Sequence, residues 1–168
     1  MAATQILSEI FSGAGVTLLG GAICAAVTGI GSARAVGSVG QVASGALTEN
    51  PDSFGKLVVL QALPGTQGIY GLVIWLLTMV LSNFQAAGAS MSLGKGFLYL
   101  LCTLPMTLVG YWSAVYQGRV AADGIGLVAR RPEDQTKALT MAAMVETYAI
   151  LALLVSILSM IFVGSVNL

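Results

Sequence analysis

Residues 144–151 are Met-Val-Glu-Thr-Tyr-Ala-Ile-Leu, and Glu146 is the one charged side chain in the final segment of the chain, Ala138 to Leu168. An apolar run of this length exceeds the roughly 20 residues that an α-helix needs to cross the hydrocarbon core of a bilayer. A carboxylate in the middle of such a helix costs from about 2.5 to well over 10 kcal/mol, depending on the reference state. The stretch therefore predicts a membrane helix that keeps a costly acid because the protein uses it.

The composition of the whole chain indicates that its solvent is lipid. Of the 168 residues, 57% are hydrophobic and 8% are charged, and the mean hydropathy is +0.90. Soluble domains carry roughly 25% charged residues. The net charge is zero and there is no basic patch, so nucleic acid is not expected as a partner. The N-terminal segment 1–6 lacks the cationic region of a signal peptide, so we expect the first apolar segment to be retained.

Charged residues divide the chain into four spans. Long uncharged runs precede Arg34, Lys95 and Arg119, and the run that contains Glu146 ends the chain. Within the longest run, between Lys56 and Lys95, a turn is expected at Ser82, Asn83 and Gly88. Pro51 and Pro132, each followed by an acidic residue, are typical helix starts. We predict an all-α membrane protein whose four transmembrane helices cover about residues 11–46, 54–82, 94–128 and 135–165.

The cations indicate how the helices are oriented. Six of the seven, all but Lys95, lie in or near the loops that join the first helix to the second and the third to the fourth. Cytoplasmic loops carry an excess of lysine and arginine. Both of these loops are therefore expected in the cytoplasm and both termini outside the cell membrane.

The second half of the chain repeats the first. An ungapped alignment of the two halves pairs Gly13 with Gly94, Gly29 with Gly110, Gly37 with Gly118, Pro51 with Pro132 and Thr66 with Thr147. From this pairing, called the repeat alignment below, we predict two tandem helical hairpins, residues 1–82 and 83–168. The glycines of the first helix are typical of close helix packing in lipid, where small residues let backbones approach. Glu146 aligns with Gly65, so only the second hairpin keeps the carboxylate.

Uncharged polar side chains gather at the depth of Glu146. Counting at 1.5 Å per residue from the two cytoplasmic loops places Thr66, Gln67, Gln117 and Glu146 roughly 18 to 23 Å below them. Leu63, Thr66, Gln67 and Tyr70 have the spacing of one helix face. Alone, a threonine or glutamine in a membrane helix commonly makes a structural hydrogen bond. Together with a carboxylate at one depth they predict a site, in which Tyr70 is expected to donate its hydroxyl hydrogen to Glu146.

Pro64 lies within the helix segment that carries Leu63, Thr66, Gln67 and Tyr70. It has no backbone N–H and so deprives the Leu60 carbonyl of its helical partner. The Leu63 carbonyl also loses its helical hydrogen bond only if the proline loosens the following turn of the helix.

The expected ligand of this site is a small monovalent cation. One carboxylate among neutral oxygen atoms gives the site a net charge of −1, so a monovalent ion makes it neutral, whereas a divalent ion leaves it charged. The chain has no histidine, and Cys24 and Cys102 are interpreted as small buried hydrophobes, which argues against transition metals. Protonation of Glu146 also neutralises it. We favour Na⁺, with H⁺ as the alternative.

Two motifs carry a resemblance to a known family. Leu-Pro-Gly-Thr-Gln-Gly-Ile-Tyr-Gly at 63–71 and the motif at 144–151 resemble subunit K of bacterial V-type ATPases, the proteolipid of the membrane rotor ring. The resemblance extends over nearly the whole chain, including Tyr116-Gln-Gly-Arg-Val-Ala-Ala and the Arg-Pro-Glu loop at 131–133. It implies that Na⁺ is held by oxygen atoms of five residues, with Tyr70 bonded to the glutamate. The implied ligands are the Leu63 carbonyl, Thr66, Gln67, Gln117 and Glu146.

The resemblance also implies the partners. Identical subunits would form a ring in the membrane lipid, with the first and third helices inside. A stator subunit would supply an arginine that makes Glu146 release its ion, and a central stalk would sit on the cytoplasmic loops. ATP hydrolysis would occur in a soluble head, since nothing in this chain binds ATP, so the chain is expected to be a non-catalytic subunit.

The residues alone leave two other functions open. The first is the same rotor carrying protons. The second, from another class, is a four-helix structural membrane protein that transports nothing.

Overall fold

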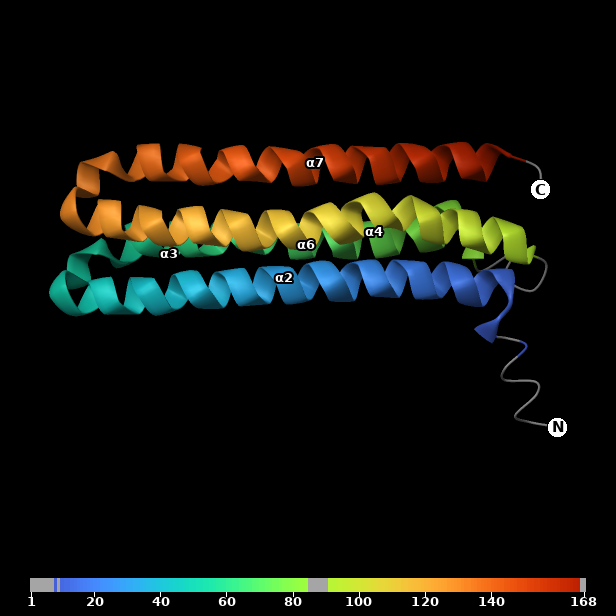
Figure 1. Cartoon of the computed structure of the whole chain (residues 1–168), viewed down its shortest axis with the longest axis horizontal. Helices are drawn as coiled ribbons and strands as arrows, with labels where there is room; N and C mark the ends of the chain where they lie inside the picture. The colour runs from blue at the N-terminus through green and yellow to red at the C-terminus, as the bar shows by residue number, and fades with distance from the viewer. Residues whose placement is uncertain (1–7, 9, 85–90, 167–168) are drawn as a thin grey trace.

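The computed structural model describes residues 8, 10–84 and 91–166, and in these ranges every regular element is a helix. The elements are α2 (Gly13–Glu49), η1 (Pro51–Ser53), α3 (Phe54–Ala62), η2 (Leu63–Gly65), α4 (Thr66–Leu81), α6 (Leu93–Arg130), η3 (Pro132–Asp134) and α7 (Gln135–Ser165). They form an elongated bundle of four rods lying side by side, with the loops after α2 and α6 at one end and both termini at the other (Figure 1).

Four segments are long and apolar enough to cross a membrane: Gly13–Glu49, Pro51–Leu81, Leu93–Arg130 and Pro132–Ser165. The prediction of an all-α protein with four transmembrane helices is confirmed. The second span differs from the expected single helix, because η2 interrupts it between α3 and α4. The expected turn residue Gly88 and the N-terminal segment 1–6 lie outside the described residues, and the hairpin limits 1–82 and 83–168 remain a prediction.

The two loops are built by the same hydrogen bonds. The amide of Asn50 donates to the Ala46 carbonyl at 3.1 Å, and the amide of Arg131 donates to the Leu127 carbonyl at 2.8 Å. In each loop the next residue is a proline that begins a 3-10 turn, where its missing N–H costs nothing. The repeat alignment pairs Asn50 with Arg131 and Ala46 with Leu127, so the repeat seen in the sequence is also a repeat of local structure.

Helices α2 and α6 pack against each other along their length, α4 packs against α2, and α7 packs against α6. Glycine allows the closest approach: a Cβ added to Gly20 would lie 2.8 Å from the Leu100 Cα, and one added to Gly31 would lie 3.0 Å from the Tyr111 Cα. No side chain larger than hydrogen fits at these separations without a shift of backbone. The expected close packing of the first helix is therefore present.

The buried residues form two apolar clusters at different heights of the bundle. The cluster near the two loops includes Val39, Leu57, Leu60, Ile125 and Val128. The cluster nearer the termini includes Cys24, Ile74, Tyr99, Met106 and Met160. Cys24 and Cys102 are free and buried, as their interpretation as small hydrophobes requires.

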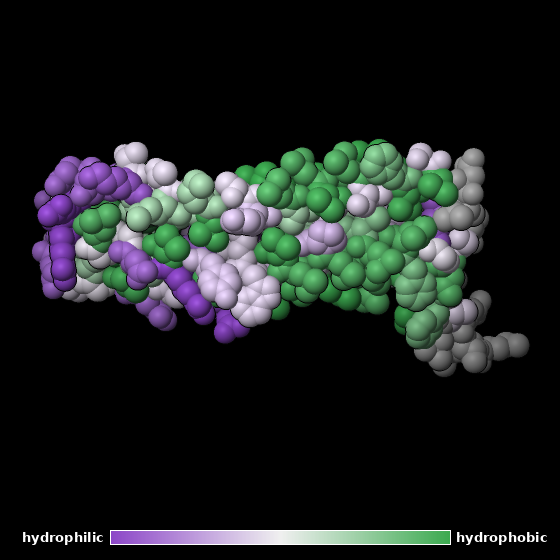
Figure 2. Space-filling view, turned by 45° about the horizontal axis from the view of Figure 1, so that its top comes forward, coloured by the Kyte–Doolittle hydropathy of each residue, from purple (hydrophilic) through white to green (hydrophobic). Residues whose placement is uncertain are grey.

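The surface changes character along the bundle. Hydrophobic side chains cover the half toward the termini, and polar side chains gather at the loop end (Figure 2). On the side of α4 and α7 the exposed residues include Ile69, Leu72, Leu151 and Leu158. Such a surface is stable in contact with acyl chains rather than water.

Candidate ion-binding site

The site begins at the break in the second span. Pro64 cannot donate to the Leu60 carbonyl, and residues 63–65 tighten into the 3-10 turn η2. The Leu63 carbonyl now accepts the backbone N–H of Thr66 and also the Thr66 hydroxyl, at 3.0 Å. The disturbance caused by the proline therefore does reach the next turn, and it gathers two oxygen atoms at the start of α4.

Glu146 lies on α7 and is bonded to side chains of two other helices. The Tyr70 hydroxyl, from α4, donates to Glu146 Oε1 at 2.6 Å. Gln117 Nε2, from α6, donates to Glu146 Oε2 at 3.3 Å. The carboxylate is half-buried, and both of its oxygen atoms have a donor. These bonds fix the position of a group that could otherwise turn toward any of its neighbours.

The two glutamines connect the remaining members of the cluster. Gln67 Nε2 donates to Gln117 Oε1 at 2.6 Å, and both side chains are fully buried. Gln67 Oε1 accepts the Thr66 hydroxyl at 3.3 Å. A continuous chain of hydrogen bonds thus runs from the Leu63 carbonyl through Thr66, Gln67 and Gln117 to the carboxylate of Glu146. The structure brings all six predicted site residues together.

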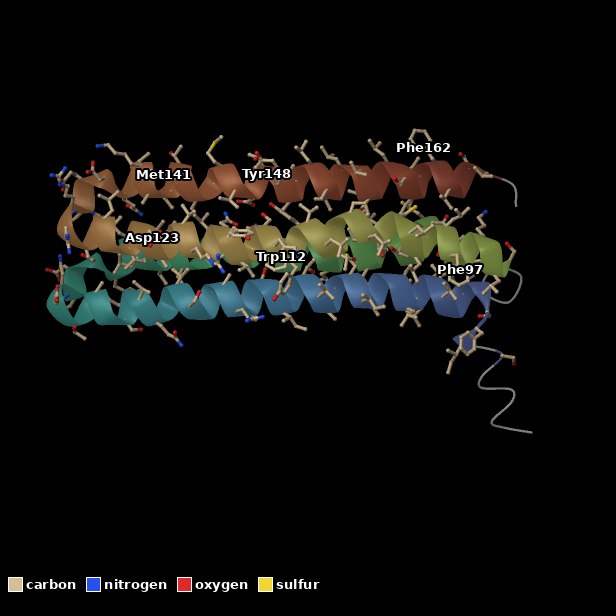
Figure 3. All side chains as sticks on the ribbon, viewed as in Figure 1. Phe97, Trp112, Asp123, Met141, Tyr148 and Phe162 are labelled. Carbon is tan, nitrogen blue, oxygen red and sulfur yellow. The ribbon has the colours of Figure 1, made fainter. Side chains whose placement is uncertain are left out.

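The polar cluster occupies a layer between the two apolar clusters. On α6, Gln117 comes after Met106 and before Ala121, and on α7 Glu146 comes after Ala142 and before Ala149. Tyr148, labelled in Figure 3, marks this level near the middle of α7. Among the described residues, no buried side-chain nitrogen or oxygen lacks a hydrogen-bond partner. The layer is therefore complete in its hydrogen bonding although apolar residues enclose it above and below.

Sequence reasoning missed two serines at this level. Ser113 accepts from Gln67 Nε2 at 3.3 Å and donates to the Val145 carbonyl at 3.1 Å, so it ties α4 to α7 through α6. Ser32 accepts the backbone N–H of Gly68 at 2.8 Å. The repeat alignment pairs the two serines, and both are buried. A hydroxyl repeated at one aligned position of α2 and α6 was the signal that could have revealed them.

The donor atoms of this site are hard oxygens. A carboxylate, a hydroxyl, a backbone carbonyl and two amides suit alkali and alkaline-earth cations rather than soft metals. In the part of the chain that the structure describes, no three His, Cys, Asp or Glu side chains come together. The single carboxylate sets the charge of the site at −1, so the arrangement can neutralise one monovalent cation.

Comparison with known proteins gives the same repeat. The family model for the C subunit of ATP synthase matches residues 19–78 and again residues 100–159, and the repeat alignment places the first match on the second. The first match contains Leu63, Thr66, Gln67 and Tyr70, and the second contains Gln117 and Glu146. Each hairpin therefore corresponds to one unit of the family, and the two tandem hairpins predicted from the sequence are confirmed.

Two relatives share most of the chain. The V-type sodium ATPase subunit K of Enterococcus hirae is 46% identical over 131 residues, which are 78% of this chain and 81% of that protein. The A-type ATP synthase subunit K of Methanocaldococcus jannaschii is 39% identical over 134 residues, which are 79% of this chain but 57% of that protein. The chain belongs to the family of ATP synthase C subunits, as a four-helix rotor-ring proteolipid of the V- and A-type ATPases.

Proposed function

We propose that this chain carries Na⁺ across the membrane, one ion at a time, at Glu146. The observation that carries the proposal is the carboxylate held by donors from two other helices beside a cluster of neutral oxygen atoms. The relative in Enterococcus hirae is named a sodium ATPase subunit, which supports the choice of ion. Family membership implies a ring of copies together with other ATPase subunits.

The ligands of the ion would be oxygen atoms of Leu63, Thr66, Gln67, Gln117 and Glu146. Amide side chains both donate and accept, so Gln67 and Gln117 can hold the carboxylate and also offer oxygen to a cation. Tyr70 acts differently, since its hydroxyl hydrogen is given to the carboxylate and orients it. Each ligand comes from the same chain, so every subunit forms a complete site.

Charge cancellation is the physical basis of transport. A carboxylate with a bound Na⁺ has no net charge, so the loaded site can face acyl chains on the apolar side of α4 and α7. Without the cation the charge would cost several kcal/mol in lipid, about 2.5 or more even on the lowest scale. An empty site must therefore stay beside a compensating charge, which in our proposal is an arginine of a stator subunit between two half-channels.

Rotation of the ring would link ion release to ATP hydrolysis. We place both interhelical loops in the cytoplasm, where a central stalk would seat on them and transmit torque from the soluble head. Each chain has one ion-site carboxylate, Glu146, for four helices, since Gly65 takes the corresponding position of the first hairpin. A ring of such chains moves half the charge per turn of a ring of equal helix number with one acid per hairpin. Each ATP is then used on fewer ions, and the pump can work against a steeper gradient.

Carbodiimide labelling of Glu146 in the assembled ring tests the choice of ion. Carbodiimides react with a protonated carboxyl group, so a cation that occupies the site excludes the reagent. We expect millimolar sodium to slow labelling at fixed pH, and choline at the same ionic strength to leave the rate unchanged. Glu146→Gln gives the background of the assay, since it removes the reactive group and changes the side chain least.

Two measurements separate the other candidates: the labelling rate and the ion-coupled ATP hydrolysis of the assembled complex. Indifference of the labelling rate to sodium would defeat the Na⁺ assignment and favour the proton-carrying rotor. A structural membrane protein without transport predicts that the Glu146→Gln complex retains ion-coupled ATP hydrolysis. Loss of coupling in that variant, with the ring still assembled, is the result that our proposal expects.

A further inference from the structure

The hydrogen bonds of the polar cluster have a direction, which is decided by the acceptors at its two ends. At one end, the Glu146 carboxylate accepts from Gln117 Nε2 at 3.3 Å. At the other end, the backbone carbonyl of Val145 accepts from the Ser113 hydroxyl at 3.1 Å. A carbonyl and an ionised carboxylate accept hydrogen bonds but cannot donate them. Each side chain between the two ends must therefore direct its hydrogen atoms so that both ends receive one.

Ser113 transmits the requirement of the Val145 carbonyl to Gln67. A serine hydroxyl has a single hydrogen, and Ser113 gives that hydrogen to the carbonyl. The Ser113 oxygen can then only accept, and it accepts from Gln67 Nε2 at 3.3 Å. Ser113 is buried, so bulk water does not compete for this bond. The NH₂ end of the Gln67 amide is therefore held toward α6.

The second N–H of Gln67 is also used. Gln67 Nε2 donates to Gln117 Oε1 at 2.6 Å, and both side chains are fully buried. With both hydrogen atoms of the NH₂ group bonded, the oxygen is the part of the amide left for another partner. Among the described residues, Gln67 Oε1 accepts from the Thr66 hydroxyl at 3.3 Å. This bond is long, so the oxygen keeps lone-pair capacity on the side of Thr66 and the Leu63 carbonyl.

A Gln67 amide turned over by half a revolution would lose these bonds. Its oxygen would face the oxygen atoms of Ser113 and Gln117, which have no hydrogen to give in this direction. Its NH₂ group would take the place that the proposed function gives to a ligand of Na⁺. An amide NH₂ group presents hydrogen atoms, so it repels a cation. The orientation of this one amide therefore decides whether the ligand set is complete.

We infer that Ser113 is a positioning residue of the ion site, which holds the oxygen of Gln67 toward the cation by linking the Gln67 amide to the Val145 carbonyl. Ser113 acts through Gln67 and is not itself one of the proposed ligands. The inference rests on the proposed function, because the orientation of Gln67 matters to transport only if this residue is a ligand.

The two ends of the cluster differ in constancy. A bound Na⁺ or a proton cancels the charge of Glu146, so the carboxylate end changes whenever the site is loaded or emptied. The Val145 carbonyl is an acceptor in every one of these states. Ser113 therefore keeps the Gln67 amide in one orientation throughout the cycle, and an arriving ion finds the oxygen already in place.

The variant Ser113→Ala in the assembled ring tests the inference. One N–H of Gln67 then has no acceptor and the amide can turn over. We expect the sodium concentration that halves the carbodiimide labelling rate of Glu146 to rise about three- to tenfold, the range of one hydrogen bond between neutral groups. The matched control is Ser156→Ala, which should leave this concentration unchanged. Ser156 is also buried and also joins α6 to α7, by accepting the Met106 N–H at 3.2 Å.

Threonine and valine at position 113 separate the hydroxyl from the space that it fills. Both side chains are branched at Cβ, and they differ by a hydroxyl in place of a methyl group. Ser113→Thr should keep the sodium concentration close to that of the unaltered ring, whereas Ser113→Val should behave like Ser113→Ala. A merely structural role of position 113 would give the same result for threonine and valine.

A double-mutant cycle with Gln67→Met shows whether Ser113 acts through Gln67. Methionine has a side chain of similar length without the amide, so Ser113→Ala should have no further effect in this background. Two independent effects would multiply. Unchanged sodium protection in Ser113→Ala, or multiplied effects in the double variant, would overturn the inference. Either outcome leaves the proposed function standing, because its own failure is indifference to sodium in the unaltered ring.

Discussion

The Tyr70 hydroxyl makes the shortest bond to the Glu146 carboxylate, 2.6 Å from Oε1. A hydrogen bond to an ionised group is shorter and roughly twice as strong as one between neutral partners. In the proposed function this bond holds the carboxylate in one rotamer, so that an incoming ion would not have to order it. Gln117, at 3.3 Å, holds the other oxygen less tightly.

Removal of this hydroxyl by Tyr70→Phe should weaken sodium binding while the ring still assembles. The freed carboxylate must be ordered at each binding event, which costs about 0.5–1.5 kcal/mol per side chain, so we expect a loss of affinity of up to about tenfold. The measurement is the sodium concentration that halves the carbodiimide labelling rate of Glu146. Tyr99→Phe is the matched control, because it removes a tyrosine hydroxyl bonded elsewhere, to the Leu81 carbonyl at 2.9 Å. An unchanged concentration in Tyr70→Phe would remove Tyr70 from the site.

At this scale the sequence predicts which residues meet and that Tyr70 donates to Glu146, but it does not predict the other hydrogen bonds among them. Helix spacing and the rise per residue are sufficient to place Thr66, Gln67, Gln117 and Glu146 at one depth, because both quantities are fixed by backbone geometry. The bond between the two glutamines depends on how closely α4 approaches α6, which no single helix determines. Ser113 was missed for the same reason, since its partners lie on two other helices.

Among the elements, the second span is the one that departs from a regular helix. The 3-10 turn η2 directs the Leu63 carbonyl to the backbone and hydroxyl of Thr66. In an uninterrupted α-helix that carbonyl would accept the N–H of the fourth residue on and point along the axis. We therefore expect the interruption to be what makes the Leu63 carbonyl available as an ion ligand.

The variant Pro64→Ala tests this role of the turn. An alanine restores the N–H that the Leu60 carbonyl lacks and removes the ring clash of the proline, so α3 and α4 should join into one helix. We expect sodium affinity to fall severalfold, measured by protection of Glu146, without loss of ring stability. Pro105→Ala is the control, because Pro105 lies inside α6 away from the site. Equal sodium protection in Pro64→Ala and the unaltered ring would show that the Leu63 carbonyl is not a ligand.

The limits of the other spans could be predicted closely from the sequence, as for α2 at 13–49 against an expected 11–46. Charges and prolines set those limits, and both are visible in the sequence. The interruption at Pro64 was foreseeable as a disturbance, but its form was not, because a proline can bend a helix or tighten one turn of it. The packing against neighbouring helices decides between these outcomes.

At the scale of the whole molecule, the sequence repeat accounts for the likeness of the two hairpins. It also shows that the polar cluster around Glu146 is not repeated in the first hairpin. Three features recur at positions that the repeat alignment pairs: the loops, the buried serines Ser32 and Ser113, and the hydroxyl-to-backbone bonds of Thr66 and Thr147. The ion site does not recur, because Gly65 and Val36 stand where the second hairpin has Glu146 and Gln117. A fold built twice therefore has one candidate ion site, and the repeat alignment shows which residues of the first hairpin stand at the corresponding position.

The repeat alignment predicts which substitutions would build a second ion site at the position of Gly65. Gly65→Glu alone would place a carboxylate beside Val36 with no ligand set around it, at a cost of about 2.5 kcal/mol or more, so we expect ring yield to fall. The repeat alignment pairs Val36 with Gln117, Tyr148 with Gln67 and Leu151 with Tyr70. Adding Val36→Gln, Tyr148→Gln and Leu151→Tyr therefore supplies the amides and the hydroxyl of the proposed ion site. The combined variant should regain ring yield and show two sodium-protected labels per chain by mass spectrometry, against one in the unaltered protein. The charge moved per turn should then double, and a combined variant that assembles with one label would contradict the repeat alignment of the site.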